Sequence, residues 1–170
     1  MKRGFSLIEL LASIAVIAVL TAIIVPSMSV VRARADSVNC LGNLRSLGVA
    51  LSSYLAENQM KMPELEAARA DKSEDVPVID NTLDAYLSSP KVFLCPSDGE
   101  EGKVTGTSYY WNSTLNGQPL ASLNFLALFS DHTKIPVLVD KEGWHKKTKE
   151  KVNHLFADGH ATNELRLFSE

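Results

Sequence analysis

Cysteine, glycine and proline are all scarce in this 170-residue chain, which contains two, nine and seven of them. Two cysteines are too few for a disulfide-dense scaffold or for a four-cysteine zinc site. So little glycine and proline excludes collagen-like and low-complexity sequences. With 45% hydrophobic and 22% charged residues, the chain is also not a disordered one. Its length suits one domain with a substantial core and is short for two.

The chain also lacks an excess of positive charge and the common catalytic motifs. Its formal net charge is −3, which gives no electrostatic basis for binding nucleic acid. It contains no HExxH zinc motif, nucleophile elbow, P-loop or dinucleotide-binding fingerprint. We therefore expect no nucleic-acid partner and no catalysis.

Charge is almost absent from the first part of the chain. Residues 5–25 read FSLIELLASIAVIAVLTAIIV, which is 21 residues with a single charge at Glu9. As a helix this segment spans about 30 Å, enough to cross the hydrocarbon core of a bilayer. The preceding Lys2 and Arg3 favour a cytoplasmic N-terminus, with the rest of the chain outside the cytoplasm. A buried core helix is the alternative, but core helices rarely sustain so long an apolar run.

Glu9 bears on whether this segment is a retained membrane helix or a signal peptide that is discarded. A signal peptide would also begin with basic residues, and residues 33–35 (Ala-Arg-Ala) offer a small-x-small cleavage site. A carboxylate inside an apolar segment costs roughly 2.5–3.5 kcal/mol on insertion, which a discarded peptide has no reason to carry. Cleavage between Gly4 and Phe5 would create an α-amino group at this depth, able to pair with Glu9 of the same chain or of a neighbouring copy.

The heptapeptide GFSLIEL at residues 4–10 resembles the N-terminal signature of type IV pilins and of the pseudopilins of type II secretion. In that family a membrane prepilin peptidase cuts after the Gly that ends a basic leader. The new N-terminal Phe is then usually N-methylated, and a Glu is the fifth residue of the mature chain. Gly4, Phe5 and Glu9 occupy these positions, and Pro26 lies where many members kink the helix. The resemblance covers roughly the first 55 residues and implies processing, methylation and assembly roles for these positions.

Beyond Pro26 the pattern remains helical and carries one apolar stripe. Its members recur at steps of four, three, four and three residues: Cys40, Leu44, Leu47, Leu51 and Tyr54. One helix is therefore expected from about residue 5 to residue 58, kinked at Pro26 rather than ended by it. Its second half would cover the core of a globular domain.

The remaining sequence predicts a short helix and then several short strands. Asp80-Asn81-Thr82 supply capping residues for the helix. Strand-like runs separated by turn residues occupy 91–95, 107–111, 135–140, 152–156 and 164–168. The expected fold class is α+β, with the long helix packed on a small antiparallel sheet, which is also the pilin architecture. The expected organisation is a leader at 1–4, a transmembrane and assembly helix at 5–30, and an extracytoplasmic globular domain at 31–170.

The two cysteines are candidates for a disulfide if the globular domain lies outside the cytoplasm. Cys40 belongs to the inward stripe of the helix and Cys95 ends an expected strand, so a bond would pin helix to sheet. It would close a loop of 55 residues, for which the chain-entropy model gives about 4 kcal/mol. Two buried thiols acting as small hydrophobic side chains are the alternative.

Patches of the later sequence resemble a subgroup of pilin-like proteins from large bacterial paralogue sets. The matching stretches are 40–45, 95–98 and 156–160. Members of that subgroup often carry a His, then nine residues, then Asp-Gly. In this chain twelve residues separate His145 from Asp158, and His160 follows the Asp-Gly pair.

Four histidines and one acidic turn raise the question of a bound metal. On a strand, His154 and His160 would lie about 20 Å apart, so they could share one ion only if Asp158-Gly159 forms a turn. Asp98-Gly99-Glu100-Glu101 could bind calcium, as loops do in the major pseudopilins that this chain resembles, or form a solvated acidic turn. We expect no cofactor, with calcium as the one candidate.

These features predict a pilin-like structural subunit that is not an enzyme. It would be processed by prepilin peptidase and assembled into a type II secretion pseudopilus or a type IV pilus. The resemblance implies further copies, related pilin-like subunits and an inner-membrane assembly platform as partners. It implies a single-pass protein of the bacterial inner membrane, with its globular domain periplasmic or in an extracellular filament. The alternative is a membrane-anchored periplasmic binding or enzymatic domain that does not polymerise.

Overall fold

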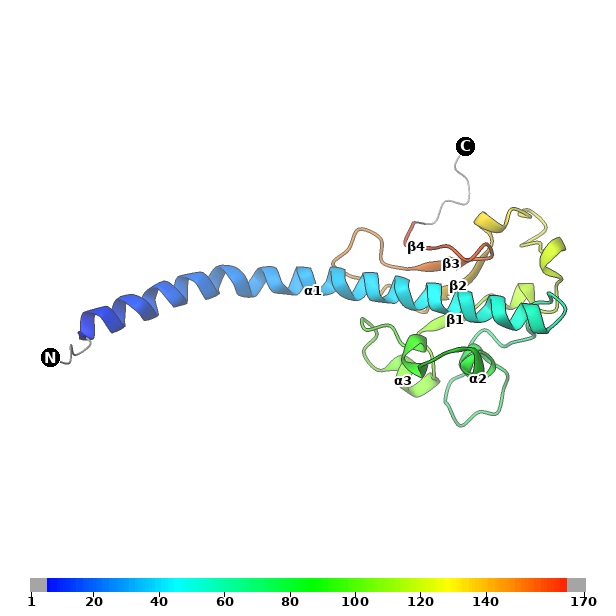
Figure 1. The fold of residues 1–170 in the computed structure, drawn as a ribbon, viewed down its shortest axis with the longest axis horizontal. Helices are drawn as coiled ribbons and strands as arrows, with labels where there is room; N and C mark the ends of the chain where they lie inside the picture. Colours follow the sequence, from blue (N-terminus) through cyan, green and yellow to red (C-terminus); the bar gives the residue numbers. More distant parts are fainter. Residues whose placement is uncertain (1–5, 165–170) are drawn as a thin grey trace.

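One helix dominates the structure, a computed structural model that describes residues 6–164 (Figure 1). This helix, α1 (Leu7–Glu57), passes through Pro26 without ending there. Its N-terminal half projects from the molecule along a gentle curve, whereas its C-terminal half lies along a globular head. The single long helix expected from the sequence is thus confirmed.

The head consists of short elements that follow α1. They are α2 (Ile79–Thr82), α3 (Glu101–Thr105), β1 (Tyr109–Trp111), β2 (Pro136–Asp140), β3 (His154–Phe156) and β4 (Ala161–Thr162). Single 3₁₀ turns lie between them at Asp84–Tyr86, Pro90–Phe93, Ser113–Leu115, Leu120–Ser122 and His132–Lys134. Elements this short are not stable alone, so packing against one another and against α1 must hold them.

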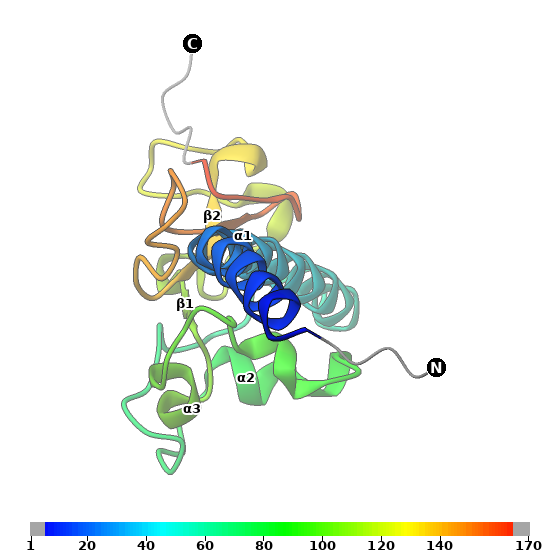
Figure 2. The ribbon, with the colours of Figure 1, turned by 90° about the vertical axis from the view of Figure 1, so that its left-hand side faces the viewer.

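The four strands form an antiparallel sheet in the order β1-β2-β3-β4. Trp111, Leu138 and Leu155 are partners in register across the first three strands and are at most 2% exposed. The second half of α1 contacts β3 and β4. Viewed from the N-terminal end, α1 runs across the head toward the viewer, with α2 and α3 below it (Figure 2). The expected α+β, pilin-like fold is confirmed.

The apolar stripe of α1 packs into the core as the sequence predicts. Its first four members, Cys40, Leu44, Leu47 and Leu51, are at most 5% exposed. Tyr54 is half-buried and meets Tyr86 edge to face, with ring centroids 6.0 Å apart. The core therefore lies against the C-terminal half of α1 only.

Two expectations for the head are wrong. Residues 91–95 do not form a strand, because Ser89 and Pro90 begin a 3₁₀ turn in which the Ser89 hydroxyl accepts the Lys91 N–H. Residues 80–82 lie inside α2 rather than before it. The N-cap residue is Val78, whose backbone N–H donates to Asn81 Oδ1 at 2.9 Å.

Two elements of the head were not expected at all. α3 begins within the predicted acidic turn, and β4 precedes the predicted strand at 164–168. That predicted strand lies outside the described residues except for Glu164, which belongs to no strand. The expected strands at 107–111, 135–140 and 152–156 are confirmed, although each begins one or two residues later than expected.

Candidate functional site

The projecting half of α1 is a continuous apolar surface. The side chains of residues 7–31 are all exposed, and the large apolar ones range from Val30 at 39% to Leu7 at 76%. The segment is long and apolar enough to cross a membrane, and none of its most apolar window packs against the head. An apolar surface of this size requires a bilayer or neighbouring helices to cover it.

Glu9 is the only charged residue in this surface and lies in the first turn of α1. Its Oε2 accepts the backbone N–H of Ser6 at 2.9 Å, which satisfies one of the free donors at the start of the helix. The helix dipole also favours a carboxylate at this end. Among residues 6–164, no basic side chain lies within 4 Å of Glu9. Its charge is therefore partly stabilised within the chain but has no counter-ion in the described part.

Comparison with known families bears directly on this end of the chain. Residues 1–25 match the family described as the prokaryotic N-terminal methylation motif. The chain carries the type IV pilin signature. No curated protein and no solved structure matches this chain. The matched segment ends before the head, so the stretches compared with the His and Asp-Gly subgroup lie outside it.

The structure locates only part of the predicted pilin processing site. Gly4 and Phe5 lie outside the described residues, so their cleavage and methylation remain predictions. Glu9 follows on the first turn of α1, and Pro26 lies inside the same helix. The boundaries at residues 4 and 30 also remain predictions.

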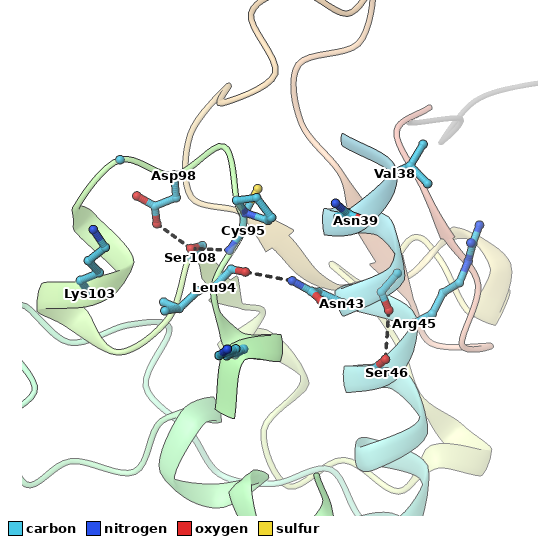
Figure 3. Close-up of a pocket in the computed structure, with 14 residues that line it drawn as sticks. Val38, Asn39, Asn43, Arg45, Ser46, Leu94, Cys95, Asp98, Lys103 and Ser108 are labelled. Atoms are coloured by element: carbon cyan, nitrogen blue, oxygen red, sulfur yellow. Dashed lines mark hydrogen bonds between the residues drawn. The ribbon is translucent and has the colours of Figure 1, made fainter. Parts of the chain in front are cut away.

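A disulfide fastens the head to α1. Cys40 on α1 and Cys95 after the Pro90–Phe93 turn are bonded to each other. Beside the bond, Asn43 Nδ2 donates to the Leu94 carbonyl at 2.9 Å, also between helix and loop (Figure 3). The bond lies close to the point where α1 leaves the head, so it fixes the projecting half relative to the head.

His145 is the centre of a buried polar cluster beside this disulfide. Its ring is fully buried, and Nε2 lies 3.3 Å from Asp140 Oδ2 and 2.7 Å from Asn153 Nδ2. Cys95 Sγ also lies 3.8 Å from Nε2, and on the other side of the ring Nδ1 lies 3.2 Å from the hydroxyl of Ser97. With Asn153 Nδ2 donating to Nε2, the ring proton lies on Nδ1 and is donated to the Ser97 hydroxyl. A proton on Nε2 would instead face Asp140 Oδ2 and would require the Asn153 amide to turn its oxygen toward the ring.

Ser97, His145 and Asp140 are residue types that also serve as nucleophile, base and acid in hydrolases. Here the His145 ring has no exposed surface, so a substrate has no approach to the atom that would take the proton. Asp140 is also occupied by the backbone N–H of Asn153, which donates to Oδ2 at 2.8 Å. The cluster connects the loop between β2 and β3 to the disulfide, which is a structural role.

The same cluster contains one group of atoms that could hold a metal. The ligand atoms of Cys40, Cys95 and His145 lie within 4.8 Å of one another. Cysteine binds metals as the thiolate, and sulfurs engaged in a disulfide are not thiolates. The disulfide form therefore lacks two of the three ligands.

The acidic turn that was a calcium candidate is used within the chain. Asp98 Oδ2 accepts from the Gly102 backbone N–H at 2.9 Å. It also accepts from the Ser108 hydroxyl at 2.5 Å (Figure 3). Glu100 pairs with Lys103 at 2.9 Å on the surface. Each of these contacts holds α3 or the loop before it, and calcium binding remains a prediction.

The remaining histidines do not join His145. His160 Nδ1 lies 2.5 Å from Asp158 Oδ1, and its ring stacks on Phe156 with centroids 4.5 Å apart. His154 is buried in β3, and burial lowers its pKa, although the nearby Asp140 opposes the shift. The expected Asp-Gly turn is present, with Gly159 at φ +88°.

Three of the cluster residues, Ser97, Asp140 and Asn153, were not singled out by the sequence. They lie 43 and 13 positions apart along the chain and follow no metal or catalytic spacing. Asp140 at the end of an apolar strand was the one available signal, because a buried carboxylate needs a donor or a cation nearby.

Proposed function

We propose that this chain is a pilin-like structural subunit, cleaved by prepilin peptidase between Gly4 and Phe5, methylated at Phe5, and assembled through α1 into a filament. The filament would be a type II secretion pseudopilus or a type IV pilus. One observation carries the proposal: an unburied apolar half-helix of pilin signature with a single carboxylate in its first turn. A single-pass anchor needs no such carboxylate, whereas an assembling helix can use it for registration.

The proposed assembly contact joins Glu9 to the Phe5 amine of a neighbouring copy. In the single chain the Glu9 carboxylate already accepts the Ser6 N–H through Oε2. A carboxylate can accept at both oxygens, so Oε1 is available for an ammonium group without loss of this cap. In a low-dielectric bundle of helices, such a charged pair would fix the stagger between neighbours.

Mass measurement tests the processing step. We expect the intact mass of the membrane form to show loss of residues 1–4 and the addition of one methyl group at Phe5. Gly4→Ala should still permit cleavage, whereas Gly4→Leu should block it, because a peptidase groove here requires close approach to the backbone. Ser13→Leu, a change of similar size further along α1, is the matched control and should be cleaved normally. A mature chain that starts at Ser27 or Asp36 would contradict the proposal.

A further inference from the structure

Basic side chains gather at the end of the head from which the apolar half of α1 projects. We call Arg32, Arg34, Lys146, Lys147 and Lys149 the basic collar; all five are exposed. The two arginines lie on α1 and the three lysines on the loop between β2 and β3. That loop, orange in Figure 1, reaches back along α1 toward its N-terminus. Lys149 lies 3.6 Å from Glu150, and the other four have no carboxylate within 4 Å among residues 6–164.

The collar lies directly beyond the apolar segment. One groove is lined both by Ile24 and Val25 of that segment and by Arg32, Lys146 and Lys147 of the collar. Along a helix, Arg32 follows Val25 by about 10 Å. The headgroup layer on each side of a bilayer is roughly 5–8 Å thick, so with residues 5–25 in the hydrocarbon the collar lies at or just above the headgroups.

Trp144 lies in the same groove as the collar lysines. Its side chain is half-buried, and its Nε1–H is buried without a hydrogen-bond partner in the described part of the chain. Tryptophan favours the boundary between hydrocarbon and headgroups, where the ring is in an apolar layer and the N–H can reach a polar group. The exposed part of the Trp144 side chain would lie at that boundary, whereas its buried N–H would not face the headgroups.

Net charge differs sharply between the segments that carry the collar and the rest of the head. Residues 26–36 and 142–151 together carry six basic and three acidic side chains, a net charge of +3. Residues 37–141 and 152–164 carry eight basic and fifteen acidic side chains, a net charge of −7. An anionic surface would attract the first region and repel the second, so the two effects favour one orientation.

We propose that the basic collar and Trp144 form a docking surface for anionic lipid headgroups of the leaflet from which α1 emerges. This inference rests on the membrane insertion of α1 within the proposed function, not on its polymerisation. Each basic side chain near an anionic membrane strengthens attachment about fivefold at moderate salt. The head of an unassembled subunit is then held down on the bilayer, and extraction into a filament breaks this contact.

Fluorescence of Trp144 tests the proposal directly. The full chain is reconstituted in nanodiscs of phosphatidylcholine containing a lipid with a nitroxide on its headgroup, with and without phosphatidylglycerol. The other tryptophan, Trp111, is buried in the core and serves as the unquenched reference. We expect phosphatidylglycerol to increase quenching of Trp144 and high salt to abolish the increase. The double variant Lys146→Gln/Lys147→Gln should lower the docking constant about 25-fold.

The matched control is Lys61→Gln/Lys72→Gln, which removes the same charge from exposed sites elsewhere on the head. In this control Trp144 should be quenched as strongly as in the wild type. Equal quenching with and without phosphatidylglycerol would overturn the proposal. Quenching of Trp144 that changes with the number of copies per disc and not with lipid charge would also overturn the proposal. That result would identify the acidic surface of a second copy as the partner. Resistance of the chain to alkaline extraction is scored in parallel. If insertion itself fails, the proposed function fails as well, whereas inserted protein without lipid-dependent quenching refutes the docking surface alone.

Discussion

At the scale of single residues, His154 shows how the head manages buried ionisable groups. Its side chain lies in β3, its Nδ1 has no hydrogen-bond partner in the described part of the chain, and burial lowers its pKa from the ordinary value of 6.5. The opposing effect of the nearby Asp140 is smaller. The folded state therefore favours the neutral ring, and protonation favours unfolding.

The sign of this effect gives a pH prediction. Below about pH 6.5 the unfolded chain binds a proton at His154 that the folded chain does not. The free energy of unfolding therefore decreases as the pH is lowered, by at most about 1.4 kcal/mol per pH unit. His154→Phe keeps a ring in the site and removes the proton, so its stability should fall less between pH 7 and pH 5.5. Chemical denaturation of both proteins in detergent measures the difference. Equal pH slopes in the wild type and the variant would contradict this account.

Lys141 is a second buried ionisable group whose charge is compensated locally. Its amine donates to the Thr105 hydroxyl at 2.7 Å, lies 3.9 Å from Glu101, and sits 5.6 Å from the centroid of the Tyr110 ring. Burial lowers the pKa of Lys141, and the carboxylates of Glu101 and Asp98 oppose that shift. These contacts hold α3 against the sheet, which explains why a helix of five residues is stable there.

At the scale of elements, the close packing of α1 on β3 depends on a glycine, Gly48. A Cβ on Gly48 would lie 3.0 Å from Leu155 Cδ1, whereas a Cβ on Gly42 would meet nothing within 4 Å. Both residues are in the same helix, so a side chain should improve helix propensity equally, by up to about 1 kcal/mol. The difference between the two sites is therefore packing alone.

Gly42→Leu and Gly48→Leu form a matched pair for this contact. We expect Gly42→Leu to leave thermal stability unchanged or to raise it slightly. Gly48→Leu should lower the free energy of unfolding by about 1–3 kcal/mol, because Leu155 is fully buried and has no room to move. Thermal melts of the full chain in detergent decide the matter. Similar melting temperatures for the two variants would show that α1 does not pack on β3 at this point.

The disulfide is the other link between elements. Replacing both cysteines, Cys40→Ser/Cys95→Ser, should lower the free energy of unfolding by about 4 kcal/mol, since the bond closes a loop of 55 residues. Reduction of the wild type should have a similar effect, and the same reductant should not change the double variant. Non-reducing mass spectrometry supplies the direct check. Free thiols in protein taken from an oxidising compartment would contradict the bond.

The sequence predicts some of these elements well and others poorly, for physical reasons. α1 and β2 are predictable because their apolar residues recur with a clear period or form one run. Residues 91–95 look like a strand, but Ser89 and Pro90 impose a local turn that overrides side-chain preference. β4 has two residues, too few to show any period, and it exists because β3 offers it an edge.

The same contrast applies to the candidate sites. The N-terminal signature can be predicted from the sequence because Gly4, Phe5 and Glu9 are close together and their spacing matches the pilin pattern. The cluster around His145 cannot be predicted from the sequence, because only folding brings Ser97, Asp140 and Asn153 to the His145 ring. Tertiary contacts of that kind leave no local pattern.

At the scale of the whole molecule, the chain is a compact head on a helix whose outer half the head leaves uncovered (Figure 1). In the proposed function the bilayer covers this half before assembly, and the helices of neighbouring copies cover it afterwards. The one charge in the uncovered segment, Glu9, has to be accommodated in both settings. The central claim is therefore that Glu9 serves the contact between copies rather than the stability of a single copy.

Comparison of Glu9→Ala with the wild type in the native host tests this claim most directly. The measurement is the level of monomer in the membrane together with the ladder of chemically cross-linked oligomers, with Ser13→Ala as control in the same apolar segment. Insertion should be unharmed or improved, by up to the roughly 2.5–3.5 kcal/mol that a charge within the bilayer costs. The ladder should be lost, because the ammonium group of the neighbouring Phe5 would then be buried without a partner. A normal ladder in Glu9→Ala, or loss of its monomer from the membrane, would contradict the account.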